Sequence, residues 1–181
     1  MPNWASGQVR IIGEKKNVRK SLHRFLSSIE NLQYRMSNVK YFARSFIDSS
    51  YKDIFENFEI DTNQSKESDI MNYVIYVSFA WSAYGCLVEG YPQMYQDTCI
   101  DLETACKIDN VEMEIYTEEE GNAIEEYIKY DSNSGLSYKC IDMPMYECLT
   151  CGNIQCFPTE ETEFYCMECY KEGYENWRKK I

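Results

Sequence analysis

Two closely spaced cysteine pairs near the C-terminus constrain this chain more than any other feature of its sequence. Cys148 and Cys151 enclose two residues, as do Cys166 and Cys169, and fourteen residues separate the two pairs. The sulfurs of each pair can point at one ion, and the intervening segment is long enough for a hairpin that brings the pairs together. Gly152 suits the positive φ of such a turn. The spacing predicts one zinc ion bound by all four cysteines.

Residues 141–181 are the expected extent of this zinc ribbon. A segment of about 40 residues rarely buries enough apolar surface to fold without a metal or a disulfide. A site closed by four thiolates leaves no coordination position for a substrate, so the ion is expected to be structural. Cys140 and Cys156 are then spare, although Cys156 stays open as a substitute ligand.

Alternation of apolar and polar residues predicts a sheet in residues 1–140. The clearest strand runs from Tyr73 to Trp81, and residues 131–135 suit a hairpin turn. The predicted strands, in order, are residues 8–12, 73–81, 111–115, 123–130 and 136–140. With two helices between them, they predict an α+β domain whose helices cover one face of a largely antiparallel sheet.

Apolar residues with helical spacing predict the first helix. They recur from Val18 to Phe46 at alternating steps of four and three, and Asn17 is the expected N-cap. A helix of this length would reach about 45 Å, so a break near residues 37–38 and a helical insertion over about 38–70 are expected. The same apolar stripe would also permit two copies of the chain to pair as a homodimer.

A second helix is expected to begin near Pro92, because proline suits the first turn of a helix. Its apolar stripe would contain Tyr95, Cys99, Leu102 and Cys106. On this pattern Cys99 and Cys106 are core thiols and not metal ligands.

Three short motifs resemble a known family. They are the opening Met1–Trp4, the segment Phe79–Ser82, and the segment Tyr116–Gly121. Together they resemble the YubB/Api92-like family, whose domain is ferredoxin-like. The resemblance implies a ferredoxin-like fold for roughly residues 1–130 and an origin in phages or plasmids; it implies no enzymatic activity. The chain departs from the family at Ala83, where a proline is usual, and in its C-terminal cysteine module.

Charge divides the chain into two parts. It carries 30 acidic and 18 basic residues, a net charge of −12. Residues 1–52 contain ten of the bases and only three acids, and the remainder is strongly acidic. Such a chain is repelled on average by nucleic acids and attracted to basic protein surfaces. Two ordinary solvated faces, one basic and one acidic and neither with a binding role, would divide the charge in the same way.

We expect the chain to work in the bacterial cytoplasm, without a membrane. It has no apolar run long enough to cross a bilayer, and its first residues lack the order of a signal peptide. Nine cysteines would suggest disulfides in a secreted protein, but paired cysteines in a reducing compartment favour metal binding.

Catalysis has little support in the sequence, so we expect no enzyme. His23 is the only histidine, and neither a glycine-rich phosphate loop nor a nucleophile triad is identifiable. The glutamates at 118–120 and 125–126 could hold a divalent ion in a metal-dependent nuclease. In an acidic protein such runs are usually only solvated.

The first functional hypothesis is an acidic, non-enzymatic inhibitor encoded by a mobile element. It would compete for a basic nucleic-acid-binding groove on a host protein or protein–nucleic acid complex, in the manner of an anti-CRISPR protein against a Cas9-like target. Sixteen tyrosines suit a protein interface. The predicted partner-binding residues are Glu118, Glu119, Glu120, Glu125 and Glu126.

The alternative is a DNA-binding module that uses the basic N-terminal helix. Its bases recur at helical spacing and could follow a phosphate backbone, with the ribbon as scaffold. The ribbon itself is a poor candidate, because residues 147–175 contain seven acids and one base. The predicted nucleic-acid-binding residues are Lys16, Arg19, Lys20, Arg24, Lys40 and Arg44.

Overall fold

The computed structural model describes residues 4–29, 40–41, 45–46, 51–89, 99–121, 123–157, 169 and 177–179. Its elements, in chain order, are β1 (Trp4–Glu14), α1 (Lys15–Ile29), β2 (Lys40–Tyr41), β3 (Ser45–Phe46), α2 (Tyr51–Asp61), β4 (Ile70–Ala80), η1 (Gly85–Glu89), β5 (Cys99–Ile100), α3 (Leu102–Asp109), β6 (Glu112–Glu119), β7 (Ile124–Asp131), β8 (Gly135–Asp142), β9 (Met145–Cys148), β10 (Ile154–Cys156) and β11 (Trp177–Lys179). No helix among these residues is both long and apolar enough to cross a membrane.

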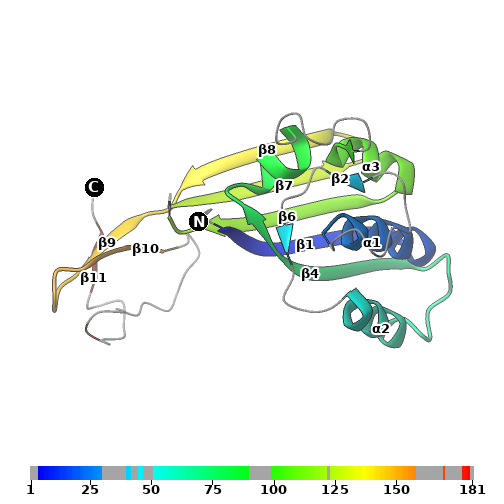
Figure 1. Cartoon of the computed structure of the whole chain (residues 1–181), viewed down its shortest axis with the longest axis horizontal. Helices are drawn as coiled ribbons and strands as arrows, with labels where there is room; N and C mark the ends of the chain where they lie inside the picture. Colours follow the sequence, from blue (N-terminus) through cyan, green and yellow to red (C-terminus); the bar gives the residue numbers. More distant parts are fainter. Residues whose placement is uncertain are drawn as a thin grey trace.

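A six-stranded sheet in the order β3-β4-β1-β6-β7-β8 forms the body of the protein (Figure 1). Every pairing in this sheet is antiparallel. The α+β class with a mostly antiparallel sheet is therefore confirmed. The finer, ferredoxin-like topology stays a prediction, and the antiparallel pairings do not exclude it, because the two parallel strands of a split β-α-β unit are separated by a third strand.

The helices lie against one face of the sheet. Alternate residues of the strands point into a single core, in which Val9 of β1, Phe79 of β4 and Ile115 of β6 pack against Leu22 and Phe25 of α1. Residues one position along each strand point to the other face, because side chains alternate in a strand. The six-stranded sheet therefore has a covered face and, among the described elements, an open face.

The first helix is shorter than its apolar stripe predicts. α1 begins at Lys15, so Asn17 lies inside the helix, and the prediction of an N-cap there is wrong. Residues 40–41 and 45–46 form short strands that pair with β5 and β4. At the C-terminal end of the apolar stripe, pairing with other strands therefore decides the local structure, although the apolar spacing there is that of a helix. Within α1 the stripe is buried under the sheet and is not available for pairing with a second copy.

The second long helix also differs from its prediction. α3 begins at Leu102, and Asp101 caps it by accepting a hydrogen bond from the backbone N–H of Thr104, 2.8 Å away. Cys99 lies in β5 and not in a helix, and Pro92 is outside the described residues. Cys106 is fully buried in the core, where burial raises the pKa of its thiol to about 12.

A second, smaller sheet follows β8. It has the order β10-β9-β11, and both of its pairings are antiparallel. Tyr146, Cys148, Phe157 and Trp177 form a separate apolar cluster on one side of it. The rings of Phe157 and Trp177 meet edge to face, with centroids 4.9 Å apart. A cluster of this size is too small to stabilise an independent fold, which agrees with a need for a metal.

Gly7 is required where β1 crosses β6. A Cβ atom at this position would lie 2.0 Å from the backbone oxygen of Tyr116. Gly7→Ala is therefore expected to force the two strands apart and to lower the free energy of unfolding by about 3 kcal/mol, a fall in Tm of roughly 6–12 °C. Thermal unfolding followed by circular dichroism measures the change. Ser6→Ala, on the open face beside it, is the control; equal Tm values for the two variants would contradict the close approach.

Candidate metal centre and binding surfaces

Three of the four predicted metal ligands meet in the small C-terminal sheet. The Sγ atoms of Cys148, Cys151 and Cys169 lie within 4.8 Å of one another, and those of Cys148 and Cys169 are 3.6 Å apart. Two thiolates of a tetrahedral site with Zn–S bonds of about 2.3 Å are about 3.8 Å apart, whereas the sulfurs of a disulfide are about 2.05 Å apart. The spacing fits shared ligation of one metal ion and excludes a disulfide.

The loop after β9 supplies this geometry. The backbone N–H of Gly152 donates to the carbonyl of Cys148 over 2.8 Å, and Gly152 has a φ of 75°. The left-handed conformation that the sequence predicted for this glycine is thus present. Burial acts to raise the pKa of the Cys148 thiol, but hydrogen bonds from the backbone N–H groups of Cys151 and Thr150 and from neighbouring thiols outweigh it and lower that pKa. The arrangement favours the thiolate, which is the form that binds metals.

The cysteine group stands alone among the described residues. No other set of three cysteine, histidine or acidic side chains there brings its ligand atoms within the same distance. Neither glutamate run forms such a set. The predicted ligand Cys166 lies outside the described residues. Cys156 is half-buried, and its thiol donates to the carbonyl of Glu120 over 3.6 Å.

The basic side chains of α1 are turned onto the protein's own acids. The guanidinium of Arg19 bridges two carboxylates, with Nε 2.5 Å from Glu59 and Nη1 2.7 Å from Glu67. These hydrogen bonds lower the pKa of both carboxyls and raise that of Arg19. Lys16 Nζ lies 2.7 Å from a carboxylate oxygen of Glu14. Each contact competes with a phosphate for the same cation.

Arg24 is an interior residue. Its Nε and Nη2 atoms donate to the two carboxylate oxygens of Asp109 over 2.7 and 3.0 Å, and both residues are buried. Lys20 lies 3.3 Å from the same carboxylate. The prediction that Arg24 binds nucleic acid is therefore wrong, because the pair joins α1 to α3 inside the protein. Arg44 and the side chain of Lys40 lie outside the described residues.

Glu126 is also interior, contrary to its predicted role in partner binding. Its carboxylate accepts hydrogen bonds from the backbone N–H of Ala83 and the hydroxyl of Ser82, each over 2.7 Å, and from the hydroxyls of Thr117 and Tyr138. It thus holds the chain reversal after β4 against the sheet. A buried carboxylate with four donors has its hydrogen-bonding capacity filled inside the protein.

The other four predicted partner-binding glutamates differ in how far they are exposed to solvent. Glu119 and Glu125 are buried, so they do not belong to the surface of the described structure, and this part of the prediction is corrected. Glu118 is half-buried and Glu120 is exposed. Glu118, Glu119 and Glu120 line a hollow of about 380 Å³ together with Trp4. Alternation along β6 explains why Glu119 is buried between Glu118 and Glu120, because neighbouring residues point to opposite faces. It does not explain Glu125, which is adjacent to Glu126 and is also buried.

An acidic surface that the sequence analysis did not single out lies on α2 and the loop after it. Residues 51–70 contain six acids and two bases, and all six acids are exposed. Ile60 and Ile70 beside them are 65% and 72% exposed. We call this set the α2 acidic surface: Asp53, Glu56, Glu59, Asp61, Glu67 and Asp69. The excess of acids within residues 51–70 is visible in the sequence, but the sequence alone does not show that all six are exposed.

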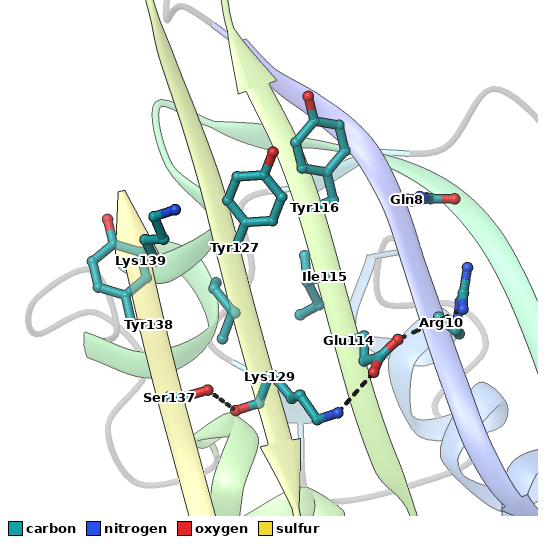
Figure 2. A pocket seen from close by; sticks show the side chains of 11 residues that line it. Gln8, Arg10, Glu114, Ile115, Tyr116, Tyr127, Lys129, Ser137, Tyr138 and Lys139 are labelled. Carbon is teal, nitrogen blue, oxygen red and sulfur yellow. Dashed lines mark hydrogen bonds and ion pairs between the residues drawn. The ribbon is translucent and has the colours of Figure 1, made fainter. Parts of the chain in front are cut away.

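The open face of the large sheet was missed altogether. Figure 2 shows the rings of Tyr116 on β6 and Tyr127 on β7 standing above the strands, with Lys139 beside Tyr127 and Arg10 on the opposite side. These residues line a cavity of about 380 Å³. The two ring centroids are 4.8 Å apart, and Lys139 Nζ lies 5.9 Å from the Tyr127 centroid. Only the β6–β7 register, in which Tyr116 lies opposite Tyr127, brings the rings together.

A scan of protein-family models finds no match for this chain, and searches of curated proteins and of solved structures find none either. The resemblance to the YubB/Api92-like family therefore stays a prediction from the three short motifs.

Proposed function

We propose that the three clustered cysteines bind one structural zinc ion and that Cys166 is its fourth ligand. The support is the position of the three described sulfurs within 4.8 Å of one another, together with the two-residue separation that Cys166 shares with Cys169. Such a closed site would stabilise the small sheet and take no part in catalysis. Its predicted effects on folding are given in the Discussion.

We propose that the protein is a non-enzymatic, acidic inhibitor that occupies a basic, nucleic-acid-binding groove of another protein. The observation that carries this proposal is the α2 acidic surface, whose six exposed carboxylates, two of them bridged by Arg19, share residues 51–70 with the exposed side chains of Ile60 and Ile70. Apolar contact area ringed by charge is typical of a protein interface. A phage or plasmid protein acting on a defence complex of the Cas9-like type, in the bacterial cytoplasm, would have this character.

The contacts of the basic side chains in α1 disfavour the DNA-binding alternative. Binding to a phosphate backbone depends on lysine and arginine side chains that displace counterions. In α1 four of these side chains contact carboxylates of the protein itself, and Lys15 is buried with its Nζ 2.6 Å from the carbonyl of Thr62. Recruiting them to DNA would first require breaking those contacts.

Reversing charge on the α2 acidic surface should abolish partner capture. The double variant Glu56→Lys/Asp61→Lys is expected to lose at least tenfold in capture of a basic nucleic-acid-binding protein from bacterial lysate, since close charge pairs at interfaces contribute about 1.5 kcal/mol or more. The matched control is Glu89→Lys/Asp142→Lys, which changes the net charge equally at exposed positions on η1 and β8. Lysates are compared with and without nuclease treatment, which removes capture through bridging nucleic acid.

Two results would refute the proposal. Equal loss in both double variants would mean that overall charge, and not this surface, governs capture. Capture that disappears after nuclease treatment would support direct nucleic-acid binding instead.

A further inference from the structure

The open face of the large sheet contains a cavity whose charge is opposite to that of the protein. Its lining includes three basic side chains and one acidic side chain, whereas the chain as a whole carries −12. The cations are Arg10, Lys129 and Lys139. Glu114 is the acid and lies between two of them, 3.7 Å from Arg10 and 3.0 Å from Lys129. The cavity therefore has a local excess of positive charge and suits an anion.

The aromatic rings in the cavity are held in fixed positions. The hydroxyl of Tyr116 donates to Glu118 over 2.6 Å, and the hydroxyl of Tyr127 donates to Glu125 over 2.7 Å. Burial and the bond to Glu118 raise the pKa of Tyr116, so its ring stays neutral. Because each ring is tied at its tip as well as at its backbone, little side-chain freedom remains to be lost when a ligand binds. Fixed, neutral rings suit stacking against a planar group.

We propose that this cavity binds a nucleoside phosphate, with the base against Tyr116 and Tyr127 and the phosphate near Lys139. A volume of about 380 Å³ falls in the range of small-molecule sites and accommodates one nucleotide. Proteins that bind single-stranded nucleic acid without reading its sequence use these same two features, aromatic stacking on the bases and cationic contacts to the phosphates.

The charge around the cavity favours a mononucleotide over a long strand. Glu118 lies at the tip of the Tyr116 ring, and Glu120 is exposed at the end of the same hairpin. A strand running along the sheet in that direction would bring further phosphates toward these carboxylates, which repel them. One phosphate beside Lys139 avoids this repulsion. The site is separate from the α2 acidic surface, so the two proposals can fail independently.

Isothermal titration with AMP tests the site on the full chain, with adenosine and inorganic phosphate as partial probes. AMP is expected to bind more tightly than either part. Tyr127→Ala should weaken AMP binding roughly tenfold or more, the usual loss on removing a stacking ring. Lys139→Glu changes an exposed side chain that does not contribute to the core, so it is expected to fold normally and to weaken AMP and phosphate together.

Two controls separate stacking from folding. Tyr127→Phe keeps the ring and is expected to retain AMP binding. Tyr76→Ala removes a ring that is 75% exposed on the same face of the sheet, on β4, which β1 separates from β6. It lies outside the cavity, so the change is expected to leave AMP binding unaltered.

Three outcomes would overturn the proposal. The first is no heat of binding with AMP at millimolar concentration, and the second is AMP binding that survives both Tyr127→Ala and Lys139→Glu. The third is tight binding of a single-stranded RNA of about ten nucleotides without measurable binding of AMP, which would show that the face binds a strand and not a nucleotide.

Discussion

Replacing Cys148 or Cys151 by serine should unfold the small C-terminal sheet and leave the six-stranded sheet folded. Apparent free energies of zinc binding in four-ligand sites are about 10–16 kcal/mol, far more than the small apolar cluster of Tyr146, Phe157 and Trp177 supplies. The bound metal falls from one ion per chain to a small fraction of that. Elemental analysis under reducing conditions measures the metal, and the near-ultraviolet circular dichroism of the aromatic rings reports the loss of packing.

The control for this change is Cys140→Ser. Cys140 is exposed on β8, outside the cysteine group, so the variant should keep its metal and its spectrum. Wild-type protein that contains no stoichiometric metal, or serine variants that retain it, would show that the sulfurs meet for another reason. Chelation of the wild-type protein should reproduce the effect of the serine variants.

Asp109→Ala is expected to lower strongly the stability of the six-stranded sheet and the helices packed on it. It leaves Arg24 buried without its carboxylate, and breaking a buried ion pair in this way costs about 3–5 kcal/mol. For a chain of this size the fall in Tm is roughly 6–20 °C. Urea unfolding followed by far-ultraviolet circular dichroism measures the loss of free energy.

Two comparisons identify the cause of that loss. The double variant Arg24→Met/Asp109→Leu should regain much of the stability, because neither side chain is then left charged in the interior. Glu103→Ala removes an exposed pair with Lys107 on the same helix and should cost less than about 1 kcal/mol. A loss of that smaller size for Asp109→Ala would mean that water reaches the pair and that Arg24 is accessible after all.

Local patterns in the sequence predicted the features that depend on near neighbours in the chain. The alternation around Tyr73–Trp81 became β4, and the turn at 131–135 joins β7 to β8 with Gly135 at a φ of 76°. The cysteine pairs predicted a metal-ligating group because their spacing is itself the geometric requirement. Cys106 was correctly assigned to the core from its helical position.

Features that depend on distant contacts could not be predicted in this way. Arg24 has the spacing of a surface base, and only the packing of α1 against α3 brings it to Asp109, 85 residues away. Glu126 was expected at the surface because acids are usually solvated, but it has four donors in the interior. The Tyr116–Tyr127 pair depends on the strand register, which two separate alternating segments do not determine.

The inhibitor proposal is tested most directly by competition on the captured partner. A labelled nucleic acid is bound to that partner, and this protein is titrated in while fluorescence anisotropy is followed. The proposal predicts that the nucleic acid is released as one equivalent of protein is added, and that release weakens at about 300 mM salt because screening reduces charge attraction. Nucleic acid that stays bound when the partner is saturated with this protein would contradict it.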